Sequence, residues 1–182
     1  MDLEANLNLT LSKVIEEGKE LTPLYGPGCT GMENLGNSCY MNSVVQILLS
    51  MPEFQNRYQD EGPMHLLTCQ KAASDCLMCQ VSKLVDGLLS GRYSDQKVAK
   101  KVFFEGQTEE EKSKIEYCQD GIKPHMFKTL VGRDHPEFKT SMQCDTQEYF
   151  GYLLEKLQRM EKSQGESTYP GDVFALELET RV

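Results

Sequence analysis

Apolar residues recur every three or four positions in two stretches of the first half of the chain, which is the spacing of one buried helical face. The first stretch begins directly after Ser38, so we expect Cys39 in the first turn of a buried helix that ends before Pro52. The second stretch is closed by Gly91, in the position of a glycine C-cap. The apolar positions are Val44, Val45, Leu48 and Leu49 in the first stretch and Leu77, Val81, Leu84, Val85 and Leu88 in the second.

Two more helices are predicted in the second half of the chain. Pro124 suits the first turn of a short helix that runs to Val131, with Gly132 as its terminator. A longer helix is predicted from Asp145 to about Glu161. Its apolar face consists of Phe150, Leu153, Leu154 and Leu157.

Three segments do not follow the helical spacing. Residues 23–36 are dense in glycine and proline, which predicts a loop leading to Cys39. Residues 93–121 are rich in charge and are expected to form a solvated connection. From Asp172 to Val182 apolar and polar residues alternate, which predicts a strand. The pattern as a whole therefore predicts a mainly helical chain with a strand at its C-terminal end.

Composition and charge narrow the possible partners. The chain has 182 residues, the length of one ordinary domain, and a net charge of −9 from 28 acidic and 19 basic side chains. This balance argues against nucleic acid and against an anionic membrane surface, because both select basic patches. The sequence contains neither a signal-peptide pattern nor an apolar stretch that spans a bilayer. Seven cysteines are an odd number for disulfides, so thiols or metal ligands in the cytoplasm or nucleus are expected.

Cys39 has the sequence setting of a reactive thiol. The thiolate is the nucleophilic form of cysteine, and the N-terminus of a helix favours it. The loop from Asn34 to Ser38 supplies backbone N–H groups and an asparagine amide that can donate hydrogen bonds to an oxyanion. The competing interpretation is that Cys39 is a small buried residue at the start of a core helix.

The run around Cys39 carries a resemblance to a known family. Residues 31–46 read GMENLGNSCYMNSVVQ and resemble the cysteine box of the ubiquitin-specific proteases. Four further segments are similar to the isopeptidase T subgroup, whose members disassemble unanchored polyubiquitin. These segments are LYGPGCTG at 24–31, GLLSG at 87–91, GIKP at 121–124 and HPEF at 135–138.

This resemblance implies a fold, a reaction and a site. The implied fold is mainly α, the thumb-like helical half of a papain-like cysteine protease that is cut at the start of its fingers strands. Residues 1–25 would be a lead segment, and residues 26–182 the N-terminal part of a catalytic domain that hydrolyses the isopeptide bond after the C-terminal glycine of ubiquitin. The family assigns nucleophilic attack to Cys39 and the oxyanion hole to Asn34. It gives packing or scaffolding roles to Tyr40, Asn42 and Gln46.

A second motif concerns the substrate. Residues 143–150 read QCDTQEYF and are similar to the family's glutamine box, which usually reads QQDAQEF. The resemblance assigns Asp145 and Glu148, with Gln143 beside them, to the arginine-rich C-terminal tail of ubiquitin. Carboxylates pair well with arginine, which gives this role a physical basis. An aspartate before a helix is also a common N-cap, and both roles are compatible.

A cysteine nucleophile needs a histidine that takes and returns a proton. In the family this histidine lies far downstream, beyond the fingers, and the tail from Asp172 resembles the entry into them. His125 and His135 are expected to be structural. We therefore expect little or no turnover from this chain without a C-terminal half of the catalytic domain. The alternative function is a non-catalytic ubiquitin-binding or scaffolding fragment, with ubiquitin or polyubiquitin again as the partner.

A last cluster has the spacing of a structural zinc site. The ligand types follow the order H-x3-C-x6-C-x2-C, which supplies a complete tetrahedral set. Some histone-deubiquitinating members of the family carry a similar cluster after their cysteine box. The alternatives are scattered thiols beside a surface histidine, or a redox role for the last two cysteines. The predicted ligands are His65, Cys69, Cys76 and Cys79.

Overall fold

The computed structural model describes residues 24–94, 121–177 and 179, together with the backbone of four two-residue strands outside these ranges. Apart from those strands and one isolated bridge, the regular structure of the described residues is helical, so the predicted mainly α fold is confirmed. Most of the lead segment and of the charged connection lies outside the described residues. The antiparallel strand pairs are β1 (Ile15–Glu16) with β2 (Lys19–Glu20), and β3 (Lys97–Val98) with β4 (Tyr117–Cys118).

Helix α1 (Cys39–Ser50) begins and ends where the hydrophobic pattern predicts. Cys39 is its first residue and Ser38 is the N-cap. Pro52 opens the next helix and, lacking an N–H group, does not continue α1. One face of α1 is buried, and it consists of Tyr40, Met41, Val44, Val45, Leu48 and Leu49.

Helix α4 (Leu77–Leu89) is the second predicted helix, and the predicted glycine signal ends it. Gly91 follows the cap residue Ser90 with a φ of +78°, the left-handed conformation that glycine adopts without steric cost.

Three short helices between α1 and α4 were not predicted. Each has too few turns for a hydrophobic period to emerge, and Phe54 and Tyr58 are the large side chains that anchor the first two. They are α2 (Pro52–Gln55), the π-helical segment η1 (Asn56–Asp60) and α3 (Gly62–Thr68).

The predicted helices of the second half are α6 (His125–Gly132) and α7 (Thr146–Ser163). Two details of the α6 prediction are wrong. Pro124 is the N-cap rather than part of the first turn, and Gly132 is the last helical residue rather than the terminator. Gly132 is instead needed for close packing, because a Cβ atom there would lie 2.5 Å from the carbonyl oxygen of Phe138.

The strand predicted from Asp172 is wrong where the structure describes it. Pro170–Phe174 forms a 3-10 helix, η2, and residues 175–177 have no regular structure. The Tyr169 backbone N–H donates to the Asp172 carboxylate at 3.2 Å, and this local bond closes a turn instead of extending the chain. Residues 178 and 180–182 of the predicted strand lie outside the described residues.

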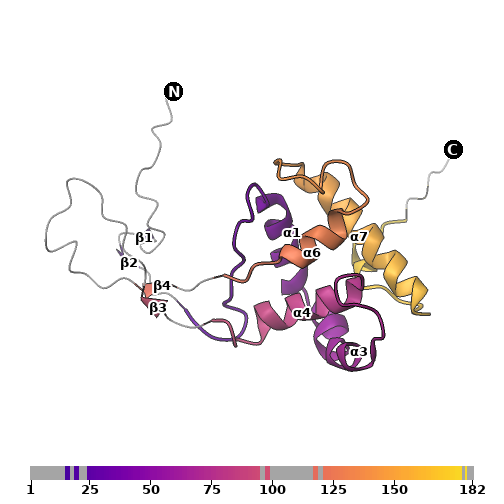
Figure 1. Cartoon of the computed structure of the whole chain (residues 1–182), viewed down its shortest axis with the longest axis horizontal. Helices are drawn as coiled ribbons and strands as arrows, with labels where there is room; N and C mark the ends of the chain where they lie inside the picture. Colours follow the sequence, from indigo (N-terminus) through magenta and orange to yellow (C-terminus); the bar gives the residue numbers. More distant parts are fainter. Residues whose placement is uncertain are drawn as a thin grey trace, which may run out of the picture.

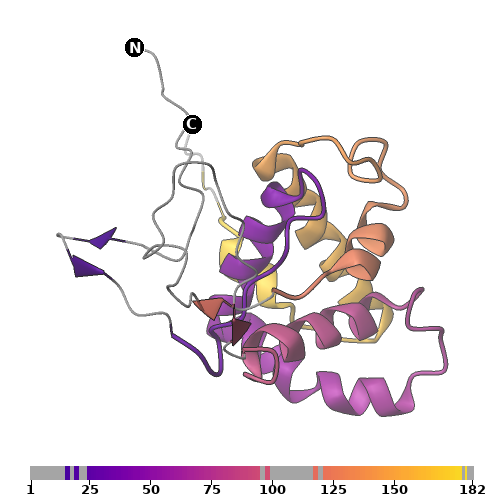
Figure 2. The ribbon, with the colours of Figure 1, turned by 60° about the vertical axis from the view of Figure 1, so that its left-hand side comes forward.

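The helices form one body around a shared apolar centre. α1 packs on α7, and α4 packs on α3, η1 and α6. In Figure 1, α1, α6 and α7 gather in the upper part of this body and α3 and α4 in the lower part, and the turned view in Figure 2 keeps the same grouping. No helix within the described residues is long and apolar enough to cross a membrane. The side chains that meet at the centre are Val45, Leu48, Leu49, Phe54, Tyr58, Val81, Leu84, Phe127, Leu153 and Leu157.

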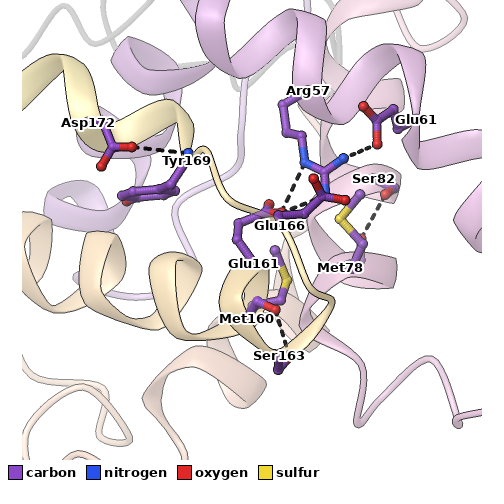
Figure 3. Close-up of polar contacts among 10 residues, drawn as sticks. All are labelled: Arg57, Glu61, Met78, Ser82, Met160, Glu161, Ser163, Glu166, Tyr169 and Asp172. Atoms are coloured by element: carbon purple, nitrogen blue, oxygen red, sulfur yellow. Dashed lines mark hydrogen bonds and ion pairs between the residues drawn. The ribbon is translucent and has the colours of Figure 1, made fainter.

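A buried ion pair joins η1 to the end of α7. The Glu161 side chain is 1% exposed, and its Oε2 accepts hydrogen bonds from Arg57 Nε at 3.0 Å and Nη2 at 2.6 Å. Figure 3 shows the guanidinium of Arg57 also facing Glu61 and Glu166. Burial, and secondly the Glu161 carboxylate, raise the pKa of Tyr58 well above its usual value. A buried charged contact therefore borders the apolar centre. Removing Arg57 or Glu161 would leave the other charge without its main partner.

We predict that Glu161→Ala lowers the free energy of unfolding by about 3 kcal/mol, because it removes the buried carboxylate that accepts two hydrogen bonds from Arg57 and leaves only the more exposed Glu61 and Glu166 beside the guanidinium. Urea denaturation of both proteins measures the difference. The matched control is Arg159→Ala, which breaks the Glu155–Arg159 pair at 2.9 Å on the exposed face of the same helix. Its loss should be below about 0.5 kcal/mol. Equal losses in the two variants would contradict the structural weight given to Glu161.

Candidate functional site

Cys39 lies at the exposed end of a buried helix. Cys39 is solvent-exposed although the following turns of α1 are buried along one face. The Ser38 side chain makes no capping hydrogen bond to the first turn, so the N–H groups there have no side-chain acceptor from their own N-cap. The interpretation of Cys39 as a buried core residue is therefore wrong. Its role as the nucleophile stays a prediction.

The loop before Cys39 turns sharply. Gly36 and Asn37 both have left-handed backbone conformations, with φ of +84° and +55°. Glycine adopts this conformation freely, and asparagine tolerates it better than most residues. Asn37 Nδ2 donates to the Ser141 carbonyl oxygen at 3.0 Å, which ties the turn to the segment ahead of α7. The exposed Asn34 side chain folds back over this turn, and its Oδ1 accepts from the Ser38 backbone N–H at 2.9 Å.

Two polar side chains of α1 hold the approaching chain. Asn42 Nδ2 donates to the carbonyl oxygen of Glu33 at 3.2 Å, and Gln46 Nε2 donates to that of Thr30 at 3.4 Å. These bonds agree with the scaffolding roles that the resemblance implies for Asn42 and Gln46. The loop before Cys39 is thus held against α1 by hydrogen bonds from two side chains of that helix.

Tyr40 anchors the first turn of α1 against α7. Its ring lies edge-on to Tyr149 at 5.1 Å between centroids and stacks on Phe138 at 5.9 Å. Burial raises the pKa of Tyr40 to about 12, and the nearby thiols of Cys144 and Cys39 add to the shift. The phenol therefore stays protonated at neutral pH and packs rather than acting as a base.

The residues of the predicted glutamine box lie at the start of α7. Asp145 is the N-cap, and its Oδ1 accepts from the Glu148 backbone N–H at 2.8 Å, so the capping role is confirmed. Gln143, Asp145 and Glu148 are all exposed. Asp145 and Glu148, but not Gln143, line an open hollow that contains a third carboxylate, that of Glu155. The hollow is lined by His135, Asp145, Gln147, Glu148, Gly151, Tyr152 and Glu155.

The three histidines of the chain are all in described positions, and none has a described side-chain contact with Cys39. His65 contacts the cysteine cluster, and His125 is the exposed first residue of α6. The ring of His135 stacks on Phe138 at 3.9 Å between centroids. Its Nδ1 accepts long hydrogen bonds from the Glu137 and Phe138 N–H groups at 3.3 and 3.4 Å. In the described residues, therefore, no imidazole is hydrogen-bonded to the Cys39 thiol.

The four predicted metal ligands converge. One ligand atom from each residue lies within 4.8 Å of all the others, and His65 Nε2 is 3.2 Å from Cys76 Sγ. His65 belongs to α3 and Cys69 is its C-cap, whereas Cys76 is the N-cap of α4 and Cys79 lies in its first turn. The cluster therefore joins the end of one helix to the start of the next.

The donor set fits a zinc ion. Tetrahedral coordination at about 2.3 Å from sulfur and 2.0 Å from nitrogen separates ligand atoms by roughly 3.5 to 3.8 Å. The widest separation in the cluster, up to 4.8 Å, would therefore shorten, and the 3.2 Å between His65 Nε2 and Cys76 Sγ would lengthen slightly. Burial raises the pKa of Cys79 to about 12, and the thiols of Cys76 and Cys69 add to the shift. A divalent cation is the kind of group that would hold such a thiol deprotonated.

Two contacts around the site were not predicted. Ser38 is fully buried beside Asn34, and His135 Nε2 lies 3.6 Å from Glu148 Oε1. The serine had a local signal, since a hydroxyl residue directly before a helix is a candidate N-cap. The histidine contact depends on how the segment before α7 folds back on the helix, which a linear pattern does not encode.

Comparison with known proteins adds a family. The family model of the ubiquitin carboxyl-terminal hydrolases matches residues 30–182. Ubiquitin carboxyl-terminal hydrolase 5 of Homo sapiens is 41% identical over 184 residues, covering 100% of this chain and 20% of that protein. Ubiquitin carboxyl-terminal hydrolase A of Dictyostelium discoideum is 38% identical over 187 residues, covering 100% of this chain and 21% of that protein. The chain thus spans about a fifth of the length of these relatives.

A solved structure supports the fold. A chain in the structure of the SAGA Ubp8/Sgf11/Sus1/Sgf73 DUB module bound to ubiquitin aldehyde superimposes with a TM-score of 0.51 at 16% identity. The match covers 75% of this chain and 25% of that one. The mainly helical body therefore has a counterpart in a larger protein of known structure.

Proposed function

The chain belongs to the ubiquitin carboxyl-terminal hydrolase family, and we propose that it provides the nucleophile-bearing part of a deubiquitinating cysteine protease. The observation that carries the proposal is the position of Cys39. Cys39 is exposed and is the first residue of a helix with one buried face. Side chains of that same helix hold the loop before it through hydrogen bonds. A rigidly held thiol at a helix N-terminus suits attack on a carbonyl carbon.

The proposed reaction is hydrolysis of the bond after the C-terminal glycine of ubiquitin. The Cys39 thiolate adds to the carbonyl carbon, and the carbonyl oxygen takes up the negative charge. Asn34 Nδ2 and backbone N–H groups near the start of α1 donate hydrogen bonds to that oxygen. Collapse of the intermediate releases the amine and leaves a thioester, which water then cleaves.

Proton transfer in this reaction needs a base that we do not assign to this chain. His65 lies in the cysteine cluster and His135 stacks on Phe138, while His125 is the exposed first residue of α6. We propose that a C-terminal half of the catalytic domain supplies the histidine and that the chain alone has no turnover. A non-catalytic ubiquitin-binding fragment is the second candidate, and the open carboxylate-lined hollow is the observation that favours it.

The proposed substrate contact is the arginine-rich tail of ubiquitin. Asp145 uses Oδ1 for the cap, and its second carboxylate oxygen can face a cation. The exposed Glu148 carboxylate, whose Oε1 lies 3.6 Å from His135 Nε2, can do the same. Gln143 is the neighbouring amide on the approach to the helix. The similarity to the isopeptidase T subgroup supports unanchored polyubiquitin as the substrate form.

We also propose that the cluster of His65, Cys69, Cys76 and Cys79 holds one structural zinc ion. The convergence of the four donors supports it. Such an ion would fix α3 to α4 in a loop region that buries little apolar surface of its own.

The first prediction of the proposed function concerns the Cys39 thiol. A ubiquitin probe with a C-terminal electrophile should label the chain at Cys39, and Cys39→Ala should abolish labelling. A fluorogenic ubiquitin substrate should show no turnover, because no base reaches the thiol. Labelling can be read by intact-mass spectrometry. Turnover that Cys39→Ala abolishes would contradict the missing base, and absence of labelling with retained ubiquitin binding would favour the non-catalytic fragment.

The second prediction separates the two roles of Asp145. Asp145→Asn keeps a capping oxygen but removes the charge, so the melting temperature should be nearly unchanged while ubiquitin binding weakens about tenfold. Asp145→Ala should weaken binding and also cost about 1 kcal/mol of stability. Calorimetry of unfolding and of ubiquitin titration measures both quantities. Unweakened binding by Asp145→Asn and Glu148→Gln would refute the tail site.

The third prediction concerns the metal. Protein purified without added metal should contain about one zinc ion per chain. The double variant Cys76→Ser with Cys79→Ser should lose the metal and melt at a lower temperature. Cys29→Ser, a cysteine outside the cluster, is the matched control and should retain it. Elemental analysis reads the content, and a metal-free protein with an undisturbed melting curve would sink the proposal.

A further inference from the structure

The Asn34 side chain is held by one residue through two hydrogen bonds. Its Oδ1 accepts from the Ser38 backbone N–H at 2.9 Å and from the Ser38 hydroxyl at 3.2 Å. A backbone N–H donates only, so the amide oxygen and not the NH2 group must face Ser38. The two N–H donors of the Asn34 amide are therefore directed away from Ser38.

The Ser38 hydroxyl is itself fixed. The side chain is fully buried, and Oγ accepts from the Leu35 backbone N–H at 2.8 Å. A serine hydroxyl has one proton, and with Leu35 donating to Oγ that proton is available for Asn34 Oδ1. Leu35, Ser38 and Asn34 thus form a short chain of hydrogen bonds in which the direction of each donor is set.

This arrangement uses Ser38 in an unusual way for its position. A serine at an N-cap normally accepts from an N–H group of the first helical turn. Here it makes no such bond to α1, in contrast to Asp145, which caps α7 through Oδ1. The hydroxyl therefore serves the loop before the helix rather than the helix itself.

We propose that Ser38 is a positioning residue that keeps the Asn34 amide aimed as a donor for the oxyanion. This inference rests on the proposed function. Ser38 does not touch the reacting atoms. When the Cys39 sulfur bonds to an aldehyde carbon, the carbonyl π-bond breaks and the thiol proton ends on the oxygen, giving a thiohemiacetal. The amide of Asn34 donates to that oxygen. The Ser38 hydroxyl adds a second bond to the one from the Ser38 backbone N–H, and together they keep the amide from rotating to offer its acceptor.

The test compares two ligands that differ only in the reacting group, ubiquitin aldehyde and ubiquitin itself. The wild-type chain should bind the aldehyde more tightly, because the adduct gains the covalent bond and the oxyanion contact. Ser38→Ala keeps the bond from the backbone N–H and removes the bond from the hydroxyl, so it should weaken aldehyde binding severalfold while ubiquitin binding stays near the wild-type value. The melting temperature should fall, because the Leu35 N–H loses its acceptor. Ser38→Thr keeps the hydroxyl and should restore aldehyde binding.

The matched control is Ser43→Ala, which removes a hydroxyl that bonds the Cys39 carbonyl oxygen at 2.8 Å within the same helix. It should behave as wild type toward both ligands. The inference is overturned if Ser38→Ala keeps the wild-type aldehyde affinity while the single variant Asn34→Ala loses it. Equal weakening toward both ligands also overturns it, since that outcome indicates a structural role. A wild-type chain without preference for the aldehyde refutes the proposed function itself, and the inference with it.

Discussion

The burial of one face of α1 is the constraint on which the other features depend. Its apolar side chains share a centre with those of α4 and α7, so the helix is held along its length while its first residue stays at the surface. A buried helix is close-packed and cannot shift without opening voids. The position of Cys39 is therefore set by the core, and the loop from Thr30 to Ser38 has to adapt to it through hydrogen bonds.

Hydrogen bonds at the N-terminal ends of α7 and α1 have different roles. At α7, Asp145 caps the helix and still carries a charge at the surface. At α1, Ser38 leaves the helix uncapped and directs the Asn34 amide. The same position relative to a helix thus stabilises the fold in one place and arranges donors in the other. Between Asn34 and Ser38 the chain makes a left-handed turn at Gly36 and Asn37, and the Ser38 backbone N–H donates to Asn34 Oδ1.

Much of this could be predicted from the sequence because the signals are local. The spacing of Val44, Leu48 and their neighbours predicts α1, and the H-x3-C-x6-C-x2-C order predicts donors that the structure brings together. The short helices before α4 were not predicted, because four to seven residues are too few to establish a hydrophobic period. The strand predicted from Asp172 failed because alternation needs a pairing partner, whereas the Tyr169–Asp172 bond is made within the turn. The orientation of the Asn34 side chain depends on backbone dihedral angles that the amino-acid sequence does not specify.

The uncapped start of α1 has a consequence for how this chain can be stabilised. A missing N-cap bond leaves about 1 kcal/mol of helix stability unrealised. Selection or engineering for thermal resistance would therefore find gains at this helix end, by drawing the Ser38 side chain, or a substitute, onto the first turn. Each such gain would take the Ser38 hydroxyl away from Asn34, which would keep only the backbone N–H bond, and would occupy N–H donors in the first turn of α1. On the proposed function, stability and reactivity therefore oppose each other at this helix end.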